Sequence, residues 1–578
     1  MQFCQFSEPL SCIFRVKNKY LPSFTKSTTK LTRSRVRSRP YMAKRMQPIL
    51  VDITCNFVTK TKSIFTCSCN HYIDHFLISA MASMITSQSH FVLIPLMTQG
   101  HMIPMIDMAR LFAERGVTVS LVTTPYNASR FETTIHRARE SGLPILLVQL
   151  EFPCQQVGLP AGYENLDILP SRDLLTKFYE GLSMLQQPLE KHLQNQRHPP
   201  TCIISDKCLS WTSETAQKFN IPRLVFHGMG SFSLLSSHNI KFYNAHRSVS
   251  SDSEPFVIPG LPQRIEITRA QLPGSFVTLP GLDDVRDKMQ EAESTAYGVV
   301  VNTFNELEQG IVEEYEKAIK KKVWCVGPVC LYNKESLDKF ERGDKTLIDE
   351  QQCLGWLNSM EPSSVIYACL GSLCRLVPSQ IIELGLGLEA SKQPFIWVIK
   401  TGERYLELEE WLEKERFEER NKGRGLLIRG WAPQDFILSH PAIGGFITHC
   451  GWNSTIESVC HGVPMITWPL FSEQFLNEKL VVEILRIGIR VGVEIPVRWG
   501  EEEKVGVLVK KEKVEKAIAL LMDGGDDGVR RRKKARELGV MARRAVEKGG
   551  SSQLNMSSLI EDVTKLRSAQ LLKTRSSN

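Results

Sequence analysis

The amino-acid sequence predicts an α/β protein built from two parallel sheets, each covered by helices on both faces. Short apolar runs bounded by turn residues alternate with amphipathic stretches of helical length, as in parallel strands joined by helices. These runs form two series, separated by a polar stretch near 331–350. Each series is typical of one Rossmann-like half. Because ligands bind beyond the carboxyl ends of such strands, a cleft between the two halves is expected.

The first series of elements begins at residue 90. Strands are expected at 90–95, 117–123, 201–205, 223–226, 298–302 and 322–326. The first strand is followed by a loop that contains Gly100 and His101, and then by an amphipathic helix over 104–116. A further helix is expected over 213–219.

The second series begins near residue 364. Its strands are expected at 364–370, 394–399, 425–429, 443–448 and 463–467, and a last helix is expected over 553–567. The chain therefore divides into five predicted parts: an extension (1–80), an N-terminal half (81–330), a linker (331–350), a C-terminal half (351–552), and a C-terminal helix and tail (553–578).

The charge distribution restricts the kinds of partner. The net charge is +8, but residues 1–80 hold thirteen basic and three acidic side chains, so the rest of the chain is close to neutral. We therefore expect no nucleic-acid partner, and read the basic run 530–536 as a solvated helix face. No apolar run reaches the ~20 residues of a membrane span, so no integral membrane segment is expected.

The extension 1–80 differs from the rest in composition. It is rich in Ser, Thr, Arg and Lys, which resembles an organelle transit peptide; the favoured alternative is that translation starts at Met81. Its Cys67, Cys69, His71 and His75 match no common zinc-finger spacing. Many of the remaining cysteines lie in apolar strands, as free thiols of a reducing compartment do. We therefore expect a cytoplasmic protein, or a plastid one if the extension is a transit peptide.

The segment 444–457 reads as a strand, a glycine turn and the start of a helix. A helix N-terminus presents free N–H groups to an anion such as a pyrophosphate, Gly451 allows close approach, and His449 ends the strand. The pattern is neither a dinucleotide fingerprint nor a Walker loop. Glu457 has two interpretations, a ligand contact or a capping box with Ser454. Trp431 is either a core residue or a platform for a base.

Residues 431–474 resemble, end to end, the signature box of plant secondary-product UDP-glycosyltransferases. The matching elements are Trp431-Ala432-Pro433-Gln434, His440-Pro441, Gly444-Gly445-Phe446, His449-Cys450-Gly451-Trp452-Asn453-Ser454, Glu457-Ser458, Gly462-Val463-Pro464, Trp468-Pro469 and Glu473-Gln474. The resemblance extends over about 84–567 and includes Gln99-Gly100-His101, Phe226-His227-Gly228 and Leu370-Gly371-Ser372. These stretches are similar to the branch that glucosylates cytokinins, brassinosteroids, flavonols and sapogenins.

The resemblance implies a GT-B fold, with an acceptor-binding half followed by a donor-binding half, and a role for each matching residue. Trp431 would stack on uracil, and the Ala432 backbone would bond its edge. Gln434 and Glu457 would hold the ribose. Ser372, His449, Asn453 and Ser454, with Gly451 beside them, would bind the diphosphate. Trp452, Glu473 and Gln474 would contact the sugar, and a Gln at the last position goes with UDP-glucose in this family.

A base is expected in the other half of the molecule. His101 follows the first strand at the cleft, and the ordinary pKa of histidine, ~6.5, suits a base; a helix-capping role is equally compatible with its position. The resemblance makes His101 the catalytic base and makes Asp206 the carboxylate that orients it. The neighbouring Lys207 should face away from Asp206 because successive strand residues alternate sides.

These expectations combine into an inverting transfer of glucose from UDP-glucose to a hydroxyl of a small lipophilic plant metabolite. A UDP-sugar donor and a small acceptor are the expected partners of a monomeric enzyme. No metal or other cofactor is expected, since the donor half has no Asp-x-Asp motif. The alternatives are another donor such as UDP-galactose or UDP-xylose, or a nucleotide-sugar binding protein without turnover. A nicotinamide oxidoreductase is disfavoured because no Gly-x-Gly-x-x-Gly follows the first strand.

Overall fold

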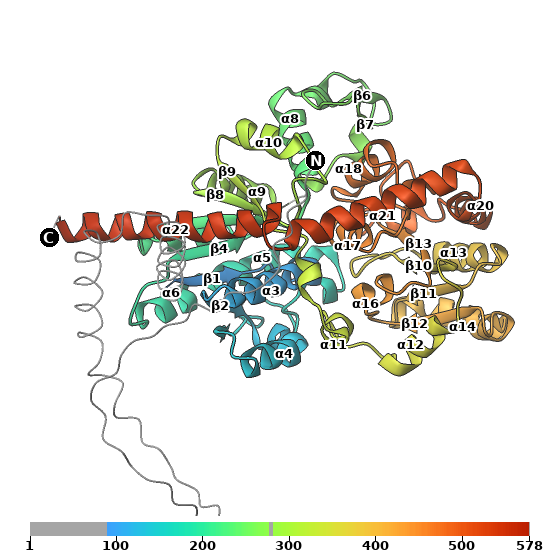
Figure 1. Ribbon diagram of the computed structural model, residues 1–578, viewed down its shortest axis with the longest axis horizontal. Helices are drawn as coiled ribbons and strands as arrows, with labels where there is room; N and C mark the ends of the chain where they lie inside the picture. Colours follow the sequence, from blue (N-terminus) through green and yellow to red (C-terminus); the bar gives the residue numbers. More distant parts are fainter. Residues whose placement is uncertain (1–88, 277–280, 577–578) are drawn as a thin grey trace, which may run out of the picture. The chain divides into compact units, whose positions relative to one another are not determined.

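The computed structural model describes residues 89–276 and 281–576, with side chains as far as residue 571. The extension, with its Cys67, Cys69, His71 and His75 group and Met81, lies outside the described residues. Within these ranges the chain forms two parallel sheets with helices around them (Figure 1). The predicted α/β class with two Rossmann-like sheets is therefore confirmed.

The N-terminal sheet has seven parallel strands in the order β3-β2-β1-β4-β5-β8-β9. They are β1 (His90–Ile94), β2 (Thr118–Thr123), β3 (Ile145–Gln149), β4 (Cys202–Asp206), β5 (Arg223–His227), β8 (Gly298–Val301) and β9 (Lys322–Cys325). The central strands β1 and β4 are buried on both faces, which is why they read as continuous apolar runs. The edge strand β3 was not predicted; its burial is interrupted by exposed positions.

The C-terminal sheet has six parallel strands in the order β12-β11-β10-β13-β14-β15. They are β10 (Val365–Cys369), β11 (Phe395–Ile399), β12 (Gly425–Arg429), β13 (Ile443–Thr448), β14 (Met465–Thr467) and β15 (Gly488–Arg490). The sequence did not predict β15, which has only three residues. Strands β10 and β13 lie side by side at the centre, so the loops after them meet at the same edge of the sheet.

Helices connect the strands in both halves. The N-terminal half contains α3 (Gln99–Glu114), α4 (Pro125–Glu140), α5 (Leu175–Met184), α6 (Gln186–Gln194), α7 (Thr212–Lys218), α8 (Ser231–Phe242), α9 (Asp283–Ser294) and α10 (Ile311–Ile319), and a hairpin of β6 (Pro255–Val257) and β7 (Glu266–Thr268). The C-terminal half contains α12 (Glu350–Asn358), α13 (Pro378–Ala390), α14 (Leu406–Lys414), α15 (Phe417–Arg420), α16 (Gln434–Leu438), α17 (Trp452–His461), α18 (Gln474–Lys479), α19 (Glu502–Val505), α20 (Lys511–Met522) and α21 (Asp526–Val546).

The last helix, α22 (Ser551–Ser576), returns to the N-terminal half. It begins two residues before the predicted start. Figure 1 shows α22 alongside the N-terminal sheet, whereas α21 lies on the C-terminal half. Met556, Leu559, Ile560 and Val563 are buried in the hydrophobic core of the N-terminal half. The chain therefore crosses between the halves a second time, and this holds the two sheets together.

The polar stretch 331–350 is more structured than the predicted linker. It contains the short helix α11 (Ser336–Phe340) and leads to Asp349, whose side chain caps α12 by accepting from two backbone N–H groups. Arg110 from α3 and Arg137 from α4 pair with Asp338 on α11 at 2.6 and 2.8 Å. We call residues 331–349 the connector. The division of the chain into domains at these boundaries stays a prediction.

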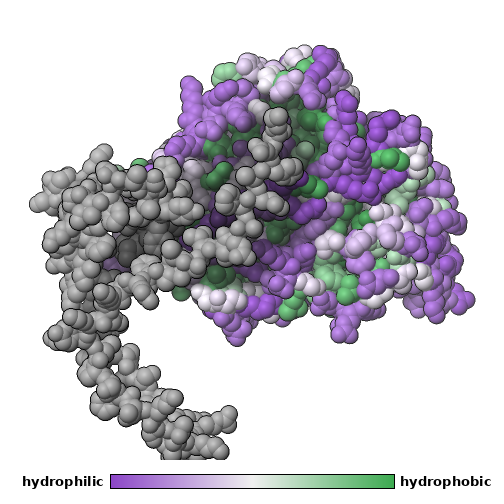
Figure 2. Space-filling view, in the orientation of Figure 1, coloured by the Kyte–Doolittle hydropathy of each residue, from purple (hydrophilic) through white to green (hydrophobic). Residues whose placement is uncertain are grey.

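The outer helices of the C-terminal half present a polar surface. Figure 2 shows mainly hydrophilic side chains over α20 and α21. The basic run 530–536 lies on α21, where Arg530 pairs with Asp527 and Ala535 faces the core. This agrees with a solvated helix face. In the ranges 89–276 and 281–576, no helix combines the length and the apolar character needed to cross a membrane.

Candidate active site

A cavity of about 290 Å³ lies between the two halves, at the carboxyl ends of both sheets. Its lining includes Gly100, His101 and Gly228 from the N-terminal half and segments after five strands of the C-terminal half. Every predicted site residue lines this cavity except Asp206, which is buried behind His101. The fold thus brings the two predicted sets of residues to one place.

The position of His101 corrects one expectation. The helix α3 begins at Gln99 and not at Pro104, so His101 lies in the first helical turn rather than in a loop. Thr98 precedes the helix in an extended conformation, with φ −156° and ψ 146°. Pro104 has no N–H, which leaves the Gly100 carbonyl without its usual helical donor. The side-chain amide of Asn453, from the other half, donates to that carbonyl at 2.6 Å.

His101 and Asp206 form a tight pair. The distance from His101 Nδ1 to Asp206 Oδ2 is 2.5 Å, and the backbone N–H of Cys208 donates to the other carboxylate oxygen at 2.9 Å. Burial alone would lower the pKa of His101, but the charge of Asp206, its hydrogen bond and the charge of Glu473 together raise that pKa above its ordinary value. Burial opposes ionisation of Asp206, and the His101 partner nevertheless holds its pKa below the usual range. With Nδ1 donating to Asp206, Nε2 is the free acceptor at the cavity.

Lys207 does not compete for Asp206. Its ammonium lies 3.5 Å from Glu293 Oε2, and Glu293 also accepts from the buried His227 at 2.7 Å. The expectation that Lys207 faces away from Asp206 is therefore confirmed.

His449 is enclosed by two glycines. A Cβ atom at Gly371 would come within 2.5 Å of its ring, and one at Gly451 within 2.3 Å, so only glycine fits at either position. Burial, assisted by the charge of Lys400, lowers the pKa of His449 to about 4. The imidazole is therefore neutral at pH 7. Its Nδ1 atom has no hydrogen-bond partner among the described residues.

The helix α17 starts beside this imidazole. Gly451 is the N-cap residue and Trp452 the first helical residue, so the backbone N–H groups of the first turn have no acceptor within the helix. The capping box is therefore wrong, because Ser454 already lies inside the helix. Instead, Gln434 Nε2 donates to Ser454 Oγ at 3.1 Å and to Glu457 Oε2 at 2.7 Å.

Lys400 is a cation at this end of the cavity that the sequence reading missed. It follows β11, its Nζ donates to the Ser372 carbonyl, and burial lowers its pKa. Its place at the carboxyl end of a strand is the signal that could have identified it.

The connector contacts two of the residues expected to bind the nucleoside, Trp431 and Glu457. Trp431 is half-buried, and the connector residue Gly343 approaches its ring so closely that a Cβ there would lie 2.3 Å away. Arg342, from the same segment, bonds Glu457. Nothing in the sequence pointed to Arg342, because a polar connector gives no indication of what its side chains contact.

The residues expected to contact the sugar already form some hydrogen bonds within the protein. Gln474 Oε1 accepts from the backbone N–H groups of Leu470 and Phe471 at 2.7 and 3.0 Å. Glu473 accepts from the Ser472 hydroxyl at 2.6 Å. The indole N–H of Trp452 donates to the Asn302 carbonyl in the N-terminal half at 2.8 Å. The amide N–H groups of Gln474 therefore remain as its donors toward a ligand.

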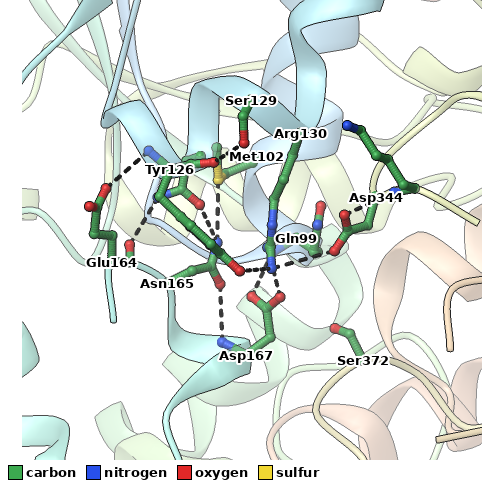
Figure 3. Close-up of polar contacts among 12 residues, drawn as sticks. Gln99, Met102, Tyr126, Ser129, Arg130, Glu164, Asn165, Asp167, Asp344 and Ser372 are labelled. Atoms are coloured by element: carbon green, nitrogen blue, oxygen red, sulfur yellow. Dashed lines mark hydrogen bonds and ion pairs between the residues drawn. The ribbon is translucent and has the colours of Figure 1, made fainter. Parts of the chain in front are cut away.

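A second polar cluster borders the cavity on the N-terminal side. Figure 3 shows Arg130, from α4, between the carboxylates of Asp167 and Asp344, at 2.9 and 3.4 Å. Gln99 lies close by, and both atoms of its side-chain amide lack a hydrogen-bond partner among the described residues. No group of three or more His, Cys, Asp or Glu side chains in the described part of the chain is arranged to hold a metal ion.

Comparison with known proteins identifies the family of both halves of the chain. Residues 349–492 match the family described as UDP-glucoronosyl and UDP-glucosyl transferase, and residues 88–330 match the glycosyltransferase N-terminal domain. UDP-glycosyltransferase 73D1 of Arabidopsis thaliana is 61% identical over 500 residues, covering 84% of this chain and 99% of the relative. UDP-glycosyltransferase 73C13 of Barbarea vulgaris is 52% identical over 490 residues, covering 84% and 99%.

Solved structures of plant glycosyltransferases have a similar fold. UGT73P12 of Glycyrrhiza uralensis, complexed with glycyrrhetinic acid 3-O-monoglucuronide, superposes with a TM-score of 0.77 at 38% identity, covering 84% of this chain and 98% of that one. UGT71G1 of Medicago truncatula, complexed with UDP-glucose, gives a TM-score of 0.66 at 27% identity, covering 83% and 100%. The fold is thus that of a GT-B glycosyltransferase. The chain belongs to the plant UDP-glycosyltransferases of family 1, in the UGT73 group.

Proposed function

We propose that this UDP-glycosyltransferase transfers glucose from UDP-glucose to a hydroxyl group of a small lipophilic plant metabolite, with inversion at the anomeric carbon. One observation carries the proposal: His101, held by the buried Asp206 at 2.5 Å, faces the cavity that the donor-box residues line. A binding protein without turnover has no need of an oriented base at that place. A cytoplasmic location remains part of the proposal.

The proposed reaction is a direct displacement. His101 Nε2 accepts the proton of the acceptor hydroxyl as its oxygen bonds to C1 of glucose, and the bond from C1 to the diphosphate oxygen breaks. UDP leaves with that electron pair. The imidazolium that forms is stabilised by Asp206. The charge that develops on UDP meets the first-turn N–H groups of α17 and the neutral imidazole of His449.

The preference for glucose rests on Gln474. Its carbonyl oxygen is held by the 470–471 backbone, so its amide N–H groups have a fixed direction toward the sugar hydroxyls. The lipophilic acceptor is supported by relatives: UGT73P12 was solved with glycyrrhetinic acid 3-O-monoglucuronide, and UGT89C1 of Arabidopsis thaliana with quercetin.

The test is an assay of the purified protein with UDP-glucose, UDP-galactose and UDP-xylose against a panel of triterpenoid, steroid, flavonoid and hormone alcohols. UDP release is measured together with the mass of the product. The proposal predicts a hexose adduct in the β configuration with UDP-glucose as the preferred donor. Donor binding without any product on the panel would favour a binding protein, and an α-linked product would contradict inversion.

A further inference from the structure

The connector lies directly on the nucleoside end of the cavity. Gly343 has φ +103°, and a Cβ atom there would lie 2.3 Å from the Trp431 ring and 3.0 Å from Ile103 of α3. Thr346 forms isolated β-bridges with Gly430 and Trp431. The segment that joins the two halves therefore packs against the expected uracil platform, and a side chain at position 343 would displace it.

Arg342 joins the two halves at this point. Its Nε donates to Asp107 Oδ2 on α3 at 2.8 Å, and its Nη1 donates to Glu457 Oε1 on α17. The three side chains are 9%, 4% and 3% exposed, so the guanidinium and both carboxylates are almost completely removed from water. A forked, planar guanidinium can serve two carboxylates at once, which a lysine cannot do with the same geometry.

Every oxygen of the two carboxylates has a partner. Asn333 Nδ2 donates to the other oxygen of Asp107 at 2.9 Å, and Gln434 Nε2 donates to the other oxygen of Glu457 at 2.7 Å. These bonds fix the plane of the Glu457 carboxylate where it lines the cavity. A carboxylate offers about four lone-pair sites, so two remain for hydroxyl donors of a ligand.

Without the guanidinium, this carboxylate would be difficult to keep charged. Burial raises the pKa of Glu457, and the charge of Arg342 is the main influence that opposes the rise. A buried carboxyl that loses its cation tends to take up a proton. One of its oxygens would then become a hydrogen-bond donor, which fits a pair of ribose hydroxyls less well.

We propose that Arg342 is a positioning residue for nucleotide recognition: it pairs with the Glu457 carboxylate and keeps it aimed at the ribose hydroxyls of the donor. Through Asp107 it also ties that carboxylate to α3, the helix that carries His101. This inference rests on the proposed function, because it takes Glu457 to be the ribose ligand.

The experiment compares UDP with 2′-deoxyuridine 5′-diphosphate by isothermal titration calorimetry. The wild type should prefer UDP by about tenfold or more, since a hydrogen bond to a charged group is lost in the deoxy ligand. Arg342→Gln should weaken UDP binding and reduce the preference to within about twofold. Arg137→Gln is the matched control: it removes other ion pairs between the N-terminal half and the connector, to Asp338 at 2.8 Å and to Glu341, and should keep the wild-type preference.

Discrimination between the two nucleotides separates positioning from a general loss of structure. Arg342→Gln with the wild-type preference would overturn the inference, and so would tighter UDP binding, because Arg342 would then compete with the nucleotide. If that variant does not fold, Asp107→Asn is used in the same comparison. A preference reduced by half or more supports the inference, and an unchanged preference contradicts it. A wild type that binds neither nucleotide would instead overturn the proposed function.

Discussion

Replacing Asp206 by Asn should change both the rate of sugar transfer and its pH dependence. The charge of Asp206 raises the pKa of His101 above its ordinary value of 6.5, against the effect of burial. The base works unprotonated, so the acid limb of kcat/KM in the wild type should have its midpoint above pH 6.5. In Asp206→Asn, His101 stays buried but the negative charge beside it is lost. The midpoint should therefore fall below pH 6.5, so that the variant keeps its own maximal rate at lower pH.

The height of the plateau should fall at the same time. The 2.5 Å contact is a hydrogen bond to a charged group, worth about 1.5–3 kcal/mol. If this stabilisation is lost in the transition state, where His101 becomes an imidazolium, the maximal rate falls by about ten- to hundred-fold. Asn can also hold the ring in the wrong tautomer, which would add to the loss.

The assay is UDP release from saturating UDP-glucose across pH 5 to 9, for wild type, Asp206→Asn and Glu190→Gln. Glu190 is a buried carboxylate on α6 that bonds Lys218 and Thr215 outside the cavity lining, so its variant controls for a lost buried charge. An acid limb at the same pH in Asp206→Asn and wild type would refute the assigned cause of the His101 pKa. An unchanged plateau would refute the role of the pair.

Three further predictions follow from the geometry. Gln474→His should shift the donor preference from UDP-glucose toward UDP-galactose by the value of about one hydrogen bond, ~1–3 kcal/mol, measured as a ratio of kcat/KM; an unchanged ratio would show that this side chain does not read the sugar. His449→Gln should make the free energy of unfolding less sensitive to acid. The pKa of His449 is about 4 in the folded protein, so as pH falls below 6.5 the unfolded chain takes up a proton on this imidazole before the folded one does. The wild type should therefore lose up to about 2 kcal/mol of unfolding free energy by pH 5. Denaturant melts at pH 7 and pH 5 check this, and equal losses in both proteins would contradict it. Gly371→Ala should weaken UDP binding, because its Cβ would lie 2.5 Å from the His449 ring. Gly423→Ala is the control and should leave UDP binding unchanged, because Gly423 has a similar φ, +79° against +82°, and nothing near its Cβ. Equal UDP affinity in the two variants would contradict the close packing of Gly371 against His449.

The sequence predicts the central part of this fold well, for a physical reason. Strands such as β1 and β13 are buried on both faces and therefore consist of continuous apolar residues that a linear reading detects. The three-residue strand β15 gives no such signal. The start of α3 was misplaced because Pro104 usually marks a first turn, whereas here a residue of the other half satisfies the carbonyl that Pro104 leaves free.

The candidate site likewise contains residues that the sequence predicts and residues that only the structure identifies. The donor-box residues from Trp431 to Gln474 are close in sequence, and resemblance to one family predicted them together. Lys400 and Arg342 reach the cavity from separate elements, and only the three-dimensional structure shows their contacts. The capping box failed because a local motif ignores where the helix begins: Gly451, not Ser454, is the N-cap of α17.

The most direct test of the account is the single-turnover rate of His101→Ala on an aliphatic alcohol, with UDP binding measured in parallel. We expect the rate to fall by about 10²–10⁴, the usual range for a general base, while the affinity for UDP stays at the wild-type value. An acidic phenol, which needs less help in losing its proton, should suffer a smaller loss. A variant that keeps the wild-type rate on the aliphatic alcohol would contradict the assignment of His101 as the base, and with it the proposed mechanism.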